Sequence, residues 1–167
     1  MGTQLMREIE DVAIPELLLA YHGERQHMLT RHMDVSLIEL RNRLRHIHVE
    51  KDEIMKASRF LSNSLAEVCT YVHTCLLQNQ AKVEKWMRTG RLGKLDISCT
   101  FDHPVGECIA LNTNWKDTFQ ESQLVVVLGE SDIPGRIFQI LTAYPEATPD
   151  EIDLIYDAMD QWLLHRK

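Results

Sequence analysis

The chain has 167 residues, 44% of them hydrophobic and 26% charged, which fits one globular domain, or one with an extra helical segment, and excludes a disordered chain. The net charge of −7 argues against broad, sequence-independent binding of nucleic acids, because such binding rests on a basic surface. An RNA-directed function would therefore depend on a local basic patch, and arginines are concentrated in the first third of the chain.

Two further classes are excluded by the residues present and by their spacing. The opening stretch has early acidic residues and only a short apolar run, so we expect neither a secretion signal nor a membrane span. The cysteines form no C-x-x-C pair and fit neither a zinc site nor a disulfide framework. We expect no metal or other cofactor and four buried, reduced thiols: Cys69, Cys75, Cys99 and Cys108.

The chain begins with helical spacing of its apolar residues. Residues 6–21 are predicted to form a short helix, a break at Pro15 and a further helical turn. We interpret residues 1–23 as an N-terminal helical appendage and residues 24–167 as the main domain.

Three more helices are expected in the first half of the chain. Ser36 and Glu39 have the spacing of a capping box, which predicts a helix over about residues 37–48. Apolar residues at helical intervals predict the other two, over residues 65–76 and 80–88.

After Gly93 the apolar residues alternate with polar ones, which is typical of strands. Helices followed by an antiparallel sheet of about four strands indicate an α+β fold. A capping box formed by Thr148 and Glu151 predicts a C-terminal helix. The strands are expected at residues 95–100, 105–111, 123–128 and 135–145.

The last predicted strand, GRIFQILTAYP, ends on two hydroxyl residues. Alternation places Thr142 and Tyr144 on one face together with Phe138 and Ile140, so we expect the first half to pack on a core and the end to open onto a cleft. A polar pair at the end of an apolar strand is a candidate for chemistry. Taken alone, the segment is explained more simply by the high strand propensity of Thr and Tyr.

Arg41, Asn42 and His46 spell R-N-x-x-x-H, the pattern of the helical HEPN ribonucleases. Arg41 and His46 would lie about 140° apart around a helix, so they would share a site only loosely. HEPN domains are all-helical, whereas the second half of this chain is rich in predicted strands. We keep this ribonuclease class as an alternative that would use Arg41 and His46.

A longer match consists of short motifs in a fixed order along the chain. These motifs are ERQHMLTRH, LIELRNRL, KASRF, KVEKWM, HPVGE, LVVVLG and GRIFQILTAYP. In order and spacing they resemble the bacterial RNase A-like toxin domain found at the C-terminus of contact-dependent growth-inhibition proteins. The resemblance covers roughly residues 24–145.

The resemblance implies a metal-independent ribonuclease toxin with a kidney-shaped α+β fold that lacks disulfides. It implies tRNA as the RNA substrate, a cognate immunity protein as partner, and action in the cytoplasm of a bacterial cell after delivery from a neighbouring cell. The family's active site combines a histidine, a basic residue on the following helix and a T-x-Y pair on the last strand. These residues correspond to His32, Arg43, Thr142 and Tyr144.

These residue types suit RNA cleavage through the 2′-hydroxyl, which leaves a 2′,3′-cyclic phosphate and excludes DNA as a substrate. A histidine can move a proton near neutral pH, an arginine fork fits phosphate oxygens, and hydroxyls can donate to them. Taken singly, each of the four residues is more often structural, so a non-catalytic module that binds a protein through its acidic face remains the alternative. Further candidates for substrate binding are His27, Arg31, His103 and Trp115.

Overall fold

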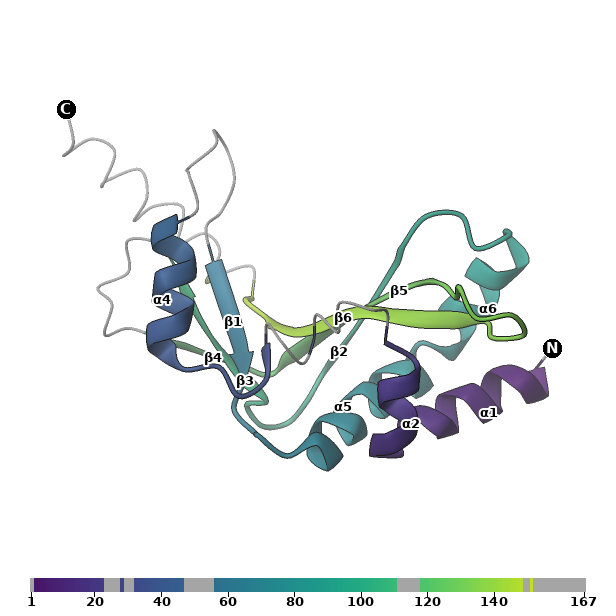
Figure 1. Ribbon diagram of the computed structural model, residues 1–167, viewed down its shortest axis with the longest axis horizontal. Coiled ribbons are helices and arrows are strands. Elements are labelled where there is room, and N and C mark those ends of the chain that lie inside the picture. Colours follow the sequence, from purple (N-terminus) through teal and green to yellow (C-terminus); the bar gives the residue numbers. More distant parts are fainter. Residues whose placement is uncertain are drawn as a thin grey trace.

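The computed structural model describes residues 2–22, 28, 32–46, 56–110, 118–148 and 151. Along the described residues the helices come first, interrupted by one strand, and the remaining strands follow (Figure 1). The helices are α1 (Gly2–Val12), α2 (Pro15–Ala20), α4 (Leu37–His46), α5 (Leu65–Gln78) and α6 (Gln80–Arg88). The strands are β1 (Lys56–Phe60), β2 (Leu95–Thr100), β3 (Gly106–Ala110), β4 (Phe119–Glu121), β5 (Gln123–Glu130) and β6 (Phe138–Glu146).

The strands form two antiparallel sheets of three strands each, ordered β1-β3-β4 and β2-β5-β6. The strands of the β1-β3-β4 sheet are shorter, so we call it the smaller sheet and the β2-β5-β6 sheet the larger sheet. The α+β class is confirmed, but the strands divide into two sheets instead of one sheet of about four. The strands β1 and β4 were not predicted from the sequence. β1 has only one large apolar residue, Phe60, and β4 has only three residues. The two sheets also exclude the all-helical HEPN fold.

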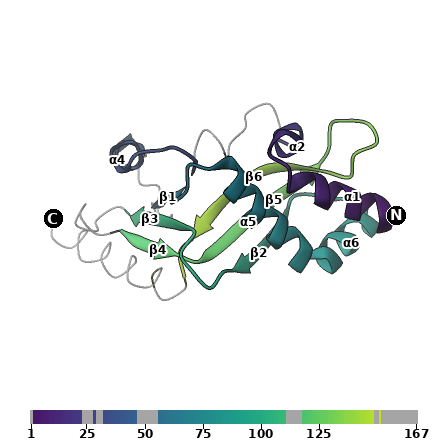
Figure 2. The ribbon, with the colours of Figure 1, turned by 90° about the horizontal axis from the view of Figure 1, so that it is seen from below.

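Each sheet has its own hydrophobic core. Buried residues of α1, α5 and α6 pack with the β2-β5-β6 sheet in what we call the main core. A smaller core joins α4 to β1 and β3 through Val35, Leu40 and Ile109. Figure 2 shows α4 above the smaller sheet, well separated from α1, α5 and α6. All four cysteines are buried and none of them forms a disulfide, as predicted.

Both predicted capping boxes are present. The Ser36 N–H donates to the Glu39 carboxylate at 2.7 Å, and the Glu39 N–H donates to Ser36 Oγ at 3.1 Å, directly before α4. Thr148 and Glu151 exchange the same pair of bonds at 3.0 and 3.4 Å. The helix predicted to follow Glu151 lies outside the described residues. In the described part of the chain, no helix is long and apolar enough to cross a membrane.

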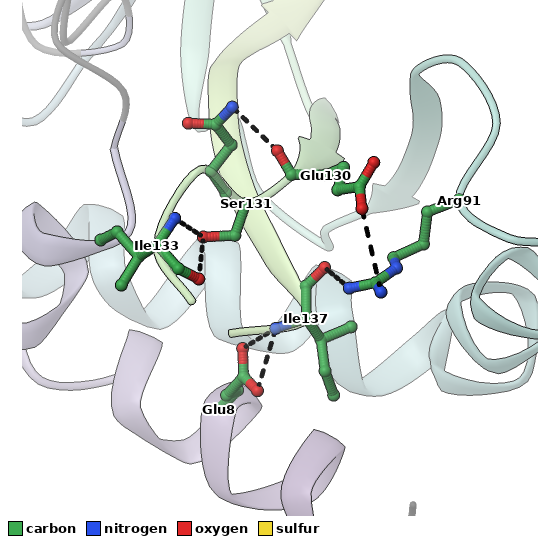
Figure 3. A network of polar contacts seen from close by, with 7 residues as sticks. Glu8, Arg91, Glu130, Ser131, Ile133 and Ile137 are labelled. Carbon is green, nitrogen blue, oxygen red and sulfur yellow. Dashed lines mark hydrogen bonds and ion pairs between the residues drawn. The ribbon is translucent and has the colours of Figure 1, made fainter. Parts of the chain in front are cut away.

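Helix α1 is bound to the β5–β6 hairpin by a buried carboxylate. Glu8 is only 2% exposed, and both of its carboxylate oxygens accept the Ile137 N–H, at 2.9 and 3.2 Å (Figure 3). On the other side of Ile137, Arg91 donates to its carbonyl oxygen at 3.1 Å. Leu5 and Ile9 of α1 lie in the main core. The division of the chain after residue 23 stays a prediction.

The two sheets meet where β6 passes β3. A Cβ atom on Gly106 would overlap the ring of Pro145 and would lie 2.6 Å from the carbonyl oxygen of Arg59. No side chain fits into this space, so glycine is what allows the last residues of β6 to lie against the smaller sheet.

We expect Glu8→Ala to lower the free energy of unfolding by about 1–3 kcal/mol, because the buried Ile137 N–H would lose its acceptor. Glu10→Ala is the matched control, since the side chain of Glu10 is 61% exposed and pairs only with His73 among the described residues. Urea unfolding of both variants measures the difference. Equal losses would contradict the role assigned to Glu8.

We expect Gly106→Ala to cost about 1–3 kcal/mol of stability, the usual range for overpacking a tight site. Gly129→Ala serves as the control, because the three atoms nearest to its added Cβ belong to the side chain of Leu141 and lie 3.0–3.3 Å away. Thermal unfolding of the two variants tests the joint. A Gly106→Ala protein as stable as Gly129→Ala would show that the sheets do not depend on this close approach.

Candidate functional site

Strand β6 contains an irregularity just before its two hydroxyl residues. Ile140 pairs with Leu128 and Thr142 pairs with Val127, so Leu141 is an extra residue without an opposite partner in the β5–β6 ladder. This is a β-bulge, which inserts one residue into a strand and shifts every later side chain to the other face.

The bulge corrects the predicted arrangement of this strand. Phe138 and Ile140 lie in the main core as expected, and Ala143 takes the next core position. Thr142 and Tyr144 do share a face, but it is the face opposite to Phe138 and Ile140. The bulge thus turns the hydroxyl pair away from the helices that cover the sheet.

His32 lies against Tyr144 on this face, with their ring centroids 5.6 Å apart and the rings inclined by 33°. The Nδ1 atom of His32 is 2.9 Å from the carbonyl oxygen of Ser58 in β1. A carbonyl only accepts, so Nδ1 carries the hydrogen and Nε2 has the lone pair when the ring is neutral. The Ser58 carbonyl therefore fixes the tautomer of His32, and the ring of His32 lies beside the phenol of Tyr144.

The environment of Tyr144 keeps its phenol protonated. Burial raises the pKa of Tyr144 above its ordinary value of 10.0, and the carboxylates of Glu146 and Asp96 raise it further. At neutral pH the Tyr144 hydroxyl is thus a hydrogen-bond donor and not a phenolate.

The hydroxyl oxygen of Thr142 is buried and has no hydrogen-bond partner among the described residues. Buried polar atoms are nearly always paired in native proteins, so an unpaired one requires an explanation. Contact with a ligand is one such explanation, and it marks Thr142 as a candidate for binding.

Arg43 lies in α4, seven residues after Ser36. Its side chain is outside the described part of the structure, so the prediction that it joins His32 and Tyr144 stays a prediction. Three other candidates, His27, Arg31 and Trp115, also lie outside the described residues.

His103 belongs to a different cluster. Its Nδ1 is 2.7 Å from a carboxylate oxygen of Asp102, and its ring lies 5.9 Å from Tyr71 of α5 and 6.0 Å from Phe101. Tyr71 belongs to the main core, so His103 lies on the helical side of the β2-β5-β6 sheet. The structure does not bring it to the face that carries Thr142 and Tyr144.

Sequence reasoning missed three features that shape the site: the bulge at Leu141, the carbonyl of Ser58 and the ion pair between Arg59 and Glu107. No glycine or proline marks the bulge, and a backbone acceptor leaves no trace in a side-chain pattern. The described residues contain no group of three or more His, Cys, Asp or Glu side chains that could hold a metal ion.

Comparisons with known proteins bear on the fold and the family of the chain. The chain is similar to a solved CdiA-CT/CdiI complex from Y. kristensenii 33638, with 23% identity and a TM-score of 0.59 over 72% of this chain and 99% of that chain. At this identity the likeness establishes the fold alone. No curated protein matches. Residues 26–145, more than half of the chain, match the family described as the bacterial CdiA-CT RNAse A domain. The chain therefore belongs to this family of RNase A-like CdiA-CT toxin domains.

Proposed function

We propose that this domain is a ribonuclease whose active site combines His32, Arg43, Thr142 and Tyr144. The observation that carries the proposal is the contact between His32 and Tyr144, two residues far apart in the sequence. In this pair His32 Nε2 has a lone pair that can accept a proton, and the Tyr144 hydroxyl keeps a proton that it can donate. Membership of the RNase A-like toxin family supports the same reaction class.

The proposed reaction is transphosphorylation within RNA. The 2′-oxygen attacks the adjacent phosphorus, the bond to the 5′-oxygen breaks, and a 2′,3′-cyclic phosphate forms. His32 Nε2 takes the proton from the 2′-hydroxyl, because hydrogen bonding to Ser58 leaves that nitrogen with the lone pair. Tyr144 stays protonated and donates toward the phosphate or the departing 5′-oxygen.

The remaining two residues would stabilise charge on the phosphate. Arg43 supplies a permanent positive charge from α4, and its guanidinium fork fits two phosphate oxygens. Thr142 supplies a hydroxyl donor whose position is fixed by the strand. Preorganised donors of this kind stabilise the transition state because they need no reorientation when charge develops.

We propose tRNA as the RNA substrate, following the family resemblance, and selective binding to match the acidic net charge of −7. DNA is not a substrate, because the nucleophile is the 2′-hydroxyl. We further propose a cognate immunity protein as partner, since the similar solved structure is a CdiA-CT/CdiI complex. The domain would act in the cytoplasm of a bacterial cell after delivery from a neighbouring cell.

Incubation of the protein with purified tRNA and with total RNA, in the presence of EDTA, tests the activity. We expect cleavage that EDTA does not stop. We expect His32→Ala to lower the rate by about 10²–10⁴-fold, the usual contribution of a general acid or base. Thr142→Val and Tyr144→Phe should each lower it by about 10²–10³-fold.

His103→Ala is the matched control for His32→Ala, because His103 lies on the helical side of the sheet. It should leave the rate unchanged. Intact RNA with the native protein would favour the non-catalytic binding module. Cleavage at the native rate in His32→Ala would remove this residue from the mechanism.

The protonation state of Tyr144 is testable by itself. NMR titration of labelled tyrosine, with Tyr144→Phe to assign the signal, should give a pKa for Tyr144 above 10. The folded state holds the Tyr144 proton more tightly than the unfolded state does. The contribution of this proton to the free energy of unfolding is therefore complete below pH 10 and is lost as the pH rises through the folded-state pKa. A value at or below 10 would contradict the effect of burial and of the two carboxylates on this pKa.

A further inference from the structure

Two consecutive residues of β1 hold the segment that leads from His32 into α4. The Ser58 carbonyl accepts from His32, and Arg59 Nη1 donates to the Val35 carbonyl at 2.7 Å. Between these two attachment points, Asp34 adopts a left-handed backbone conformation with φ of 49°. The chain therefore makes a tight turn, and β1 forms a hydrogen bond to the residues on either side of it.

Arg59 is itself fixed by a partner on the neighbouring strand. Glu107 lies opposite Arg59 in the β1–β3 ladder, and its carboxylate accepts from Arg59 Nε at 2.6 Å and pairs with Nη2. The Glu107 side chain is 10% exposed. The bond to Val35 uses Nη1, so the guanidinium fork reaches two targets at once, which a lysine ammonium does not reproduce.

Arg59 binds the carbonyl of Val35, and Val35 is the residue that sets the direction of α4. Val35 directly precedes Ser36, the N-cap of the helix, and it packs with Leu40 in the smaller core. An apolar contact between these two helix positions is a hydrophobic staple, which fixes the angle at which the chain enters a helix. Fixing the Val35 carbonyl therefore fixes the start of the helix that carries Arg43.

We propose that Arg59 is a positioning residue for the active site: through Val35 it couples α4, and with it Arg43, to the β1-β3-β4 sheet. Arg59 itself does not contact the reacting atoms in this account. The inference rests on the proposed ribonuclease function and adds the residue that aligns the cation of α4 with His32 and the end of β6.

Kinetic coupling distinguishes positioning from a general loss of stability. Arg59→Gln should lower kcat/KM for tRNA cleavage by roughly 100-fold, the loss expected when a catalytic group is displaced by about 1 Å. Combined with Arg43→Ala, it should cause little further loss, because the residue it aligns is already absent. Combined with Thr142→Val, the two losses should multiply, because Thr142 is held by β6.

Arg59→Lys keeps the positive charge and should not restore the rate, because it lacks the fork. It also serves as the test variant if Arg59→Gln fails to fold. Val83→Ala, in α6 and the main core, is the stability control. It should lower the free energy of unfolding without lowering kcat/KM at temperatures where the protein is folded.

Amide hydrogen exchange tests the coupling without any activity. The Leu40 N–H bonds to the Ser36 carbonyl in the first turn of α4, and it should exchange faster in Arg59→Gln than in Val83→Ala. Inactive native protein together with faster exchange would overturn the proposed function but keep the coupling. Unchanged exchange, or losses that multiply with Arg43→Ala as they do with Thr142→Val, would overturn the positioning role.

Discussion

The β-bulge at Leu141 is the constraint on which the candidate site depends. Without the extra residue, strict alternation would direct Thr142 and Tyr144 into the main core, behind α5 and its neighbours. With it, the first half of β6 buries its apolar side chains and the second half presents two hydroxyls on the opposite face. One inserted residue thus lets a single strand both complete a core and contribute to a site.

The second requirement is that the two sheets keep a fixed position relative to each other. β6 belongs to the larger sheet, yet its end lies against β3 at Gly106, and His32 reaches Tyr144 while bonded to β1. The smaller sheet therefore carries the histidine and the start of α4, and the larger sheet carries the hydroxyls. A displacement of one sheet relative to the other would separate the two halves of the site.

Helix boundaries and most strands could be predicted from the sequence, because capping residues such as Ser36 and apolar periodicity act locally. The shared face of Thr142 and Tyr144 was also predictable, since residues two apart on a regular stretch of strand lie on one side. Its direction was not, because the bulge depends on pairing with β5. β1 was missed because it has no continuous apolar stripe. Ser58 and Arg59 of this strand instead contact the segment before α4, through a carbonyl oxygen and a guanidinium group.

Attack by the 2′-hydroxyl determines which ends an RNA carries after cleavage, so the products reveal whether this attack occurs. A defined RNA that the protein cuts should yield a fragment ending in a 2′,3′-cyclic phosphate, identified by mass spectrometry. The same RNA with a single 2′-deoxy nucleotide on the 5′ side of the cut should remain intact at that position. Cleavage of the deoxy-substituted RNA, or a product without the cyclic phosphate, would contradict the account.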